Sequence, residues 1–201
     1  MTTPRDLLLI SLELTPRHPV ERGDLSLALA AAEVIDLLGV EAVRLDGDRI
    51  VPGYLPGLSD RLLATAAESL VRDAPHETVD DWLWRRGRGL AEAYETVLED
   101  EGLLTRQRHR GLPFRKGAAV PVDSPARWRA ADRWAAQEPV LMALATALGY
   151  GAEPAEQAPG VVDEAVTTVL ATVSDALQEL AAVRQRRAIE EAAFENIWRG
   201  E

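Results

Sequence analysis

The sequence predicts a mainly α-helical fold: one compact helical domain over residues 1–201 with small antiparallel β-hairpins, one of them basic and protruding. Three observations predict it. Apolar residues recur at helical spacing in several long segments, glycine and proline separate these segments, and an Asp-Gly pair stands between two short alternating runs. The length of 201 residues and the hydrophobic fraction of 47% suit a single core of this kind.

The first two elements are apolar. Residues 7–14 form a short run that we interpret as a strand or as the buried start of the fold. Residues 24–38 predict a central helix, because only three polar residues interrupt its apolar surface. We expect Asp24 to cap this helix and Gly39 to end it in a left-handed turn.

A hairpin and three short helices should follow. Residues 43–51 place an Asp-Gly pair between two alternating runs, which is a strong hairpin signal. Helical spacing predicts helices over residues 59–71, 78–86 and 89–101, and Thr78 is a suitable N-cap for the second.

A second hairpin is predicted from residues 103–108 and 114–122. Helices are then expected over residues 125–138, 138–149 and 161–183, with an arginine-rich tail at 184–200 that carries Ile189, Ala193, Ile197 and Trp198 at helical spacing. The apolar residues of 161–183 recur at helical spacing and indicate a helix face that packs on the core. The run is short for a coiled coil, which is the less favoured interpretation.

Composition excludes several classes of protein. The chain has no cysteine, so disulfides and thiolate sites are absent, and its formal charge of −11 argues against a general nucleic-acid binder. The three histidines show no metal-ligand spacing, and no phosphate-binding or nucleophile motif occurs. We therefore expect no catalytic residue, metal or cofactor. With no targeting segment visible, we expect a cytoplasmic protein, with any membrane contact peripheral at the inner face.

The unusual segment is 103–129, which holds seven cations and one anion within an acidic chain. Its hairpin would present basic residues around an apolar tip, which suits a membrane interface where guanidinium groups hold lipid phosphates. The residues of this predicted membrane or oligomer hairpin are Arg106, Arg108, Arg110, Leu112, Phe114, Arg115 and Lys116. In the alternative interpretation, the arginines pair with surface carboxylates and the apolar tip folds back into the core.

A winged-helix DNA-binding protein is a second interpretation, because two helices precede a strand, a basic turn and a strand. Its recognition helix would be residues 90–101, which carry five acids and no arginine. Phosphate repulsion opposes this docking, so we expect no nucleic-acid partner. A third interpretation is an oligomeric scaffold without a lipid ligand.

Four features, in order along the chain, resemble the Golgi phosphoprotein 3 family, including its bacterial members. They are the run Asp6–Ile10 that leads into a helix ending at 33–38, the helix start Val79–Leu83, the hairpin entry Glu101–Thr105, and the returning strand at 114–121. The resemblance spans about residues 1–150. The segment after it is predicted to be helical, as it is in the family.

The resemblance implies a non-catalytic peripheral membrane protein that binds the headgroup of phosphatidylinositol 4-phosphate, a phosphoinositide. Carried over by position, the family's headgroup tryptophan falls near Glu21, and its three arginines fall near Ala30 and at Arg88 and Ala91. Arg88 alone keeps the family's residue type. The neighbouring candidates for the lipid headgroup site are Trp84, Arg85 and Arg86. The family's hairpin also mediates self-association, so a homo-oligomer through the hairpin is an alternative to lipid contact.

Overall fold

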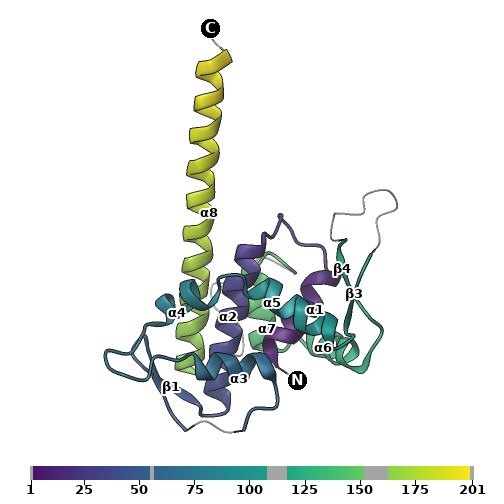
Figure 1. Cartoon of the computed structure of the whole chain (residues 1–201), viewed down its shortest axis with the longest axis vertical. Coiled ribbons are helices and arrows are strands. Elements are labelled where there is room, and N and C mark those ends of the chain that lie inside the picture. The colour runs from purple at the N-terminus through teal and green to yellow at the C-terminus, as the bar shows by residue number, and fades with distance from the viewer. Residues whose placement is uncertain (1, 55–56, 108–116, 152–162, 200–201) are drawn as a thin grey trace.

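Helices surround one central helix, and two short hairpins lie at the edges of the body (Figure 1). The computed structural model describes residues 2–54, 57–107, 117–151 and 163–199, with side chains as far as Glu191. The first elements are α1 (Thr3–Glu13), α2 (Arg22–Gly39), β1 (Val43–Asp46), β2 (Arg49–Pro52), α3 (Arg61–Glu68) and α4 (Val79–Arg86). They are followed by α5 (Leu90–Asp100), β3 (Leu104–Arg106), β4 (Ala119–Pro121), α6 (Pro125–Ala135), α7 (Pro139–Ala147) and α8 (Glu164–Arg199). The mainly α-helical fold with small hairpins is thus confirmed.

The central helix is α2, as predicted. It packs against α1, α4, α5 and α8, and every residue from Leu25 to Ile35 is buried. Its ends differ from the prediction. The N-cap is Glu21, whose backbone N–H donates to the Asp24 carboxylate at 3.0 Å, so Asp24 is the third helical residue. Gly39 closes the helix in helical geometry, and the left-handed residue is Glu41, with φ of 56°.

The segment 7–14 does not form a strand. It belongs to α1, which begins after Thr2 with Pro4 in its first turn and carries a buried run over Leu7–Ile10. This helix packs against α2, α5, α6 and α7, so neighbours cover it on several sides. A helix covered in this way has the same continuous apolar run as a buried strand, which explains why the strand interpretation is wrong, whereas the alternative of a buried start of the fold is confirmed.

Both predicted hairpins form. In the first, Asp46 pairs with Arg49, and Gly47 occupies the turn with φ of 61°, a conformation that favours glycine. In the second, Leu104 pairs with Pro121 and Arg106 with Ala119. Residues 108–116, which join these two strands, lie outside the described part of the chain.

The longest element is α8, whose 36 residues correspond to about 54 Å of helix. Its first part packs along α2, α4 and α7 and buries Val169, Val173 and Ala176. Its C-terminal half stands clear of the body (Figure 1). By length and composition alone, Glu164–Glu191 could cross a membrane. Because its valine stripe packs in the core, we treat α8 as part of the helical body.

Candidate functional site

The candidate site lies at the joint between α4 and α5, where three residues connect the two helices. Gly87 ends α4 and lies against α2: a Cβ atom there would come within 2.5 Å of the Leu83 carbonyl oxygen and 3.4 Å of the Ser26 carbonyl oxygen. Gly89, with φ of 70°, is the N-cap of α5. The two glycines thus place Arg88 between them at the start of α5.

Arg88 is exposed at this joint. Among the residues that the structure describes, it makes no ion pair or side-chain hydrogen bond. The amino end of α5 adds a partial positive charge, and its cap residue has no side chain to satisfy the first amides. One of these amides is satisfied by Ser26 of α2, whose hydroxyl accepts the Ala91 N–H at 3.0 Å. An exposed guanidinium beside a helix amino end favours an anion.

Another exposed cation, on the neighbouring helix α2, is Arg22, which the sequence did not single out. It opens α2, its side chain is 63% exposed, and one guanidinium nitrogen lies 3.4 Å from a Glu95 carboxylate oxygen. The contacts Arg22–Glu95 and Ser26–Ala91 show that α2 and α5 run side by side here. Residue 22 lies beside residue 95 and residue 26 beside residue 91, so the two helices are antiparallel and Arg22 lies along α5 away from Arg88.

Arg86 is directed into the protein. It donates two hydrogen bonds of 2.8 Å to the carboxylate of Glu33, which is fully buried, and the Tyr94 hydroxyl donates to the same carboxylate at 3.0 Å. Burial raises the pKa of Glu33, while the Arg86 guanidinium opposes that rise. Arg86 is the internal counter-ion of a core carboxylate, so we do not retain it as a headgroup contact.

Arg85 and Trp84 also have internal partners. Arg85 donates to both carboxylate oxygens of Glu77, at 3.0 and 2.7 Å, and its guanidinium carbon lies 5.1 Å from the centre of the Trp82 ring. The Trp84 indole N–H donates to Asp80 at 3.1 Å, one turn earlier in α4. The structure therefore does not bring the four candidate headgroup residues together, and Arg88 is the one without a partner in the described part of the chain.

The other positions carried over from the family do not add to this site. Ala30 and Ala91 are 0% and 1% exposed, so a side chain at either position faces the core. Glu21 is exposed at the start of α2 and pairs with Arg184 of α8 at 3.0 Å.

The stem of the basic hairpin is partly neutralised. Arg106 lies 3.1 Å from Glu95 and 2.6 Å from Glu99, and it donates to the Gly117 carbonyl. The other predicted contacts, Arg108, Arg110, Leu112, Phe114, Arg115 and Lys116, lie outside the described residues. Their membrane or oligomer role stays a prediction.

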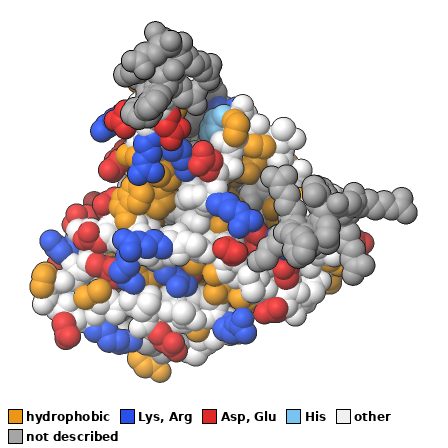
Figure 2. Space-filling model, turned by 45° about the horizontal axis from the view of Figure 1, so that its top comes forward, with side chains coloured by type: hydrophobic (Ala, Val, Ile, Leu, Met, Phe, Trp, Pro, Cys, Tyr) orange, Lys and Arg blue, Asp and Glu red, His pale blue; other side chains and the backbone are white. Residues whose placement is uncertain are grey.

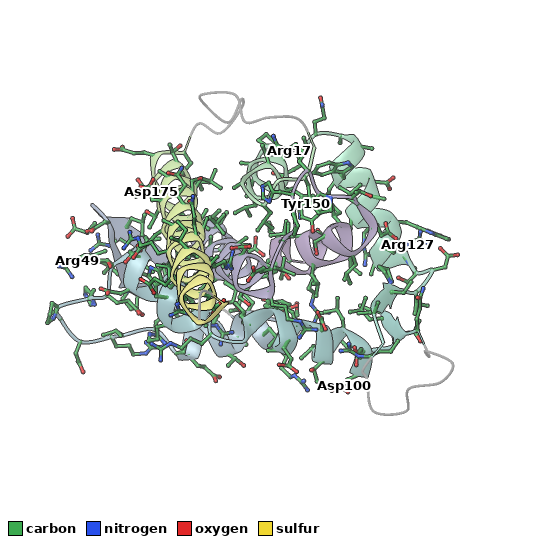
Figure 3. The ribbon with its side chains drawn as sticks, turned by 90° about the horizontal axis from the view of Figure 1, so that it is seen from above. Arg17, Arg49, Asp100, Arg127, Tyr150 and Asp175 are labelled. Carbon is green, nitrogen blue, oxygen red and sulfur yellow. The ribbon has the colours of Figure 1, made fainter. Side chains whose placement is uncertain are left out.

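Beyond the hairpin, Arg127 pairs with Glu13 and Asp123 at the edge of the body (Figure 3). Figure 2 shows basic and acidic side chains intermixed over one face of the molecule. Within the described part of segment 103–129, Arg106 and Arg127 are therefore both paired with carboxylates.

An open polar pocket lies between α1 and α6. It is lined by Thr3, Asp6, Arg129, Asp132 and Arg133. Burial raises the pKa of Asp6, and Arg133, which donates to it at 2.6 Å, counteracts the rise. Within the described residues, no group of three or more carboxylate or histidine side chains could hold a metal ion.

Comparison with known proteins identifies the family. The family model for Golgi phosphoprotein 3 (GPP34) matches residues 4–200, which is nearly the whole chain. No curated protein matches the chain. Since the family model covers all the described helices and both hairpins, the chain belongs to the Golgi phosphoprotein 3 (GPP34) family.

Proposed function

We propose that this protein is a non-catalytic peripheral membrane protein that binds an anionic phospholipid headgroup of the phosphatidylinositol 4-phosphate kind. The observation that carries the proposal is membership of the family over residues 4–200. Arg88 supports it, because its guanidinium is exposed at the amino end of α5.

The proposed headgroup contact has fewer residues than the four that the sequence predicts. Arg85 and Arg86 are held by Glu77 and Glu33, so Arg88 is the residue that we propose to meet the headgroup phosphate. The basic hairpin would add attraction to the same anionic surface. We propose a protein that resides in the cytoplasm and at the inner face of the membrane.

DNA binding is not favoured by the fold. The helix that would enter the major groove is α5, which buries Leu90, Tyr94 and Leu98 against the body. Of its carboxylates, Glu95 and Glu99 lie beside Arg106. A groove-facing surface needs exposed cations, and α5 contains no lysine or arginine.

Vesicle flotation tests the proposed function. The wild-type chain should float with vesicles that contain phosphatidylinositol 4-phosphate and less with neutral phosphatidylcholine vesicles. Its binding should weaken as salt rises. Arg88→Ser should lower the bound fraction severalfold.

Arg72→Ser is the matched control. Arg72 is also an exposed arginine without a partner in the described part of the chain, and it lies between α3 and α4. This variant loses the same charge and should float like the wild type. Absence of flotation with every anionic vesicle would reject lipid binding. Equal flotation of Arg88→Ser and Arg72→Ser would reject the site at Arg88.

A further inference from the structure

We propose that the C-terminal half of α8 is a self-association surface that pairs, in antiparallel orientation, with the same segment of a second copy of this chain. This free half is Gln185–Arg199, and it extends beyond the body (Figure 1). Every described side chain from Gln185 to Glu191 is exposed. The inference goes beyond lipid binding and does not rest on it.

A free helix of this length needs support. An isolated helix of about 15 residues is marginal in water, and most helices in proteins are stabilised by packing of one face. The first part of α8 obtains that packing from α2, α4 and α7, but the free half projects past them. A second helix laid along the free half would supply the missing packing.

One face of the free half combines an exposed aliphatic residue with two opposite charges. Arg186 and Ile189 are three residues apart, and Glu190 follows Arg186 by four, so these side chains share a face. Ile189 is 62% exposed. It lies 16 residues after the buried Val173, which places it about 160° around the helix from the packed side. This outer face continues down to the exposed Asp175, which points away from α2 (Figure 3).

The charges on this face are self-complementary in one orientation only. Within the described part of the chain, neither Arg186 nor Glu190 takes part in an ion pair. In an antiparallel pair with its two-fold axis near residue 188, Arg186 of each copy faces Glu190 of the other, and both Ile189 side chains lie between these contacts. A parallel pair would place like charges together. The antiparallel pair is isologous, so it closes as a dimer.

The area available sets the strength of this dimer. One face of a 15-residue helix is smaller than a standard protein interface, so we expect a weak, reversible dimer. Association must therefore be measured over a range of concentrations.

Sedimentation velocity with the full chain tests the proposal. The wild type should shift from monomer toward dimer as its concentration rises into the high micromolar range. Arg186→Glu and Glu190→Arg should each weaken self-association at least tenfold, because each places like charges across the two-fold axis. A mixture of the two variants should associate again, and so should the double variant R186E/E190R.

The matched control is the pair Arg187→Glu and Glu191→Arg. These residues have the same charges and the same spacing of four, but they lie on the other side of the helix from Ile189. Both variants should dimerise like the wild type. Circular dichroism should show equal helix content in all variants, which separates loss of pairing from loss of the helix.

Several outcomes would overturn the proposal. They are a wild type that stays monomeric throughout, single variants that do not associate when mixed, or equal weakening by Arg187→Glu and Arg186→Glu. A monomeric wild type whose Arg186→Glu variant loses flotation with phosphatidylserine vesicles would assign this face to a membrane instead.

Discussion

At the scale of single residues, the partner of each arginine decides what it can bind. Glu33 is the acid at the centre of α2, and it is fully buried. A buried carboxylate needs a counter-ion, and Arg86 and Tyr94 reach it from α4 and α5. One arginine of the run Arg85-Arg86-Gly87-Arg88 is therefore committed to the core before any ligand is considered.

The first residue-scale prediction concerns this ion pair. Arg86→Leu should lower the free energy of unfolding by about 3–5 kcal/mol, because it leaves the Glu33 carboxylate buried without a counter-ion. The double variant E33L/R86L should recover most of that loss. Arg88→Leu, at an exposed site, should change stability little. Urea denaturation measures all three, and a loss in Arg86→Leu no larger than that in Arg88→Leu would contradict the structural role.

The candidate site could be predicted from the sequence only in part. Arg88 could be predicted, because it occupies the position of a headgroup arginine in the family that the sequence resembles. The ion pair of Arg86 with Glu33 could not be predicted, because Glu33 lies 53 residues away along the chain. Charge runs along a sequence report which cations are present, whereas side-chain partners come from helix packing.

At the scale of elements, prediction succeeded where local signals were strong. Thr78 caps α4 through its hydroxyl, which accepts the Asp81 N–H at 3.0 Å, and α3 buries its apolar face as expected. The failure was α1, whose apolar run fits a buried strand as well as a helix covered by neighbours. The capping error at α2 has a different origin, because Glu21 and Asp24 form a reciprocal pair in which either residue resembles a cap.

The α4–α5 joint gives a prediction at this scale. Gly87→Ala should destabilise the fold by about 1–3 kcal/mol, because its Cβ would lie 2.5 Å from the Leu83 carbonyl oxygen and press on α2. Gly39→Ala should instead stabilise it by about 0.5–1 kcal/mol, since it is helical and no atom lies within 4 Å. Thermal unfolding compares the two, and a Gly87→Ala variant as stable as the wild type would contradict the close contacts of Gly87 with Leu83 and with α2.

At the scale of the whole molecule, acids and arginines are distributed as ion pairs that join distant helices. Arg5 of α1 pairs with Asp60 and with Glu101 at the end of α5, and Arg133 of α6 pairs with Asp6. These ion pairs use cations of the described part of the chain to join its helices, within a sequence of formal charge −11. For the lipid proposal, family membership and Arg88 therefore count for more than total charge.

The buried carboxylates give a prediction for pH. Burial raises the pKa of Asp6, Glu33 and Asp36, whereas the hydrogen bond from Arg5 lowers the pKa of the more exposed Glu101. A carboxyl with a raised pKa holds its proton longer in the folded than in the unfolded chain. Its contribution to stability is present below the ordinary carboxyl pKa of about 4 and is lost as pH rises through the raised pKa. The lowered pKa of Glu101 changes stability only below about pH 4.5, whereas the raised groups act above it, so the free energy of unfolding should fall as pH rises from about 4.5 toward 7.

Asp36→Asn isolates one of these groups. Its amide oxygen can still accept the Thr3 N–H, which donates to Asp36 at 2.7 Å, so the fold keeps this contact while the titration disappears. The pH slope of the unfolding free energy should become shallower by at most about 1.4 kcal/mol per pH unit, the value for one proton. Asp48→Asn, in the exposed turn of the first hairpin, removes the same charge and should leave the slope unchanged. If both variants show the wild-type slope in urea titrations between pH 4.5 and 7, Asp36 does not titrate with a raised pKa, and the net acidity of the surface must account for the dependence on pH.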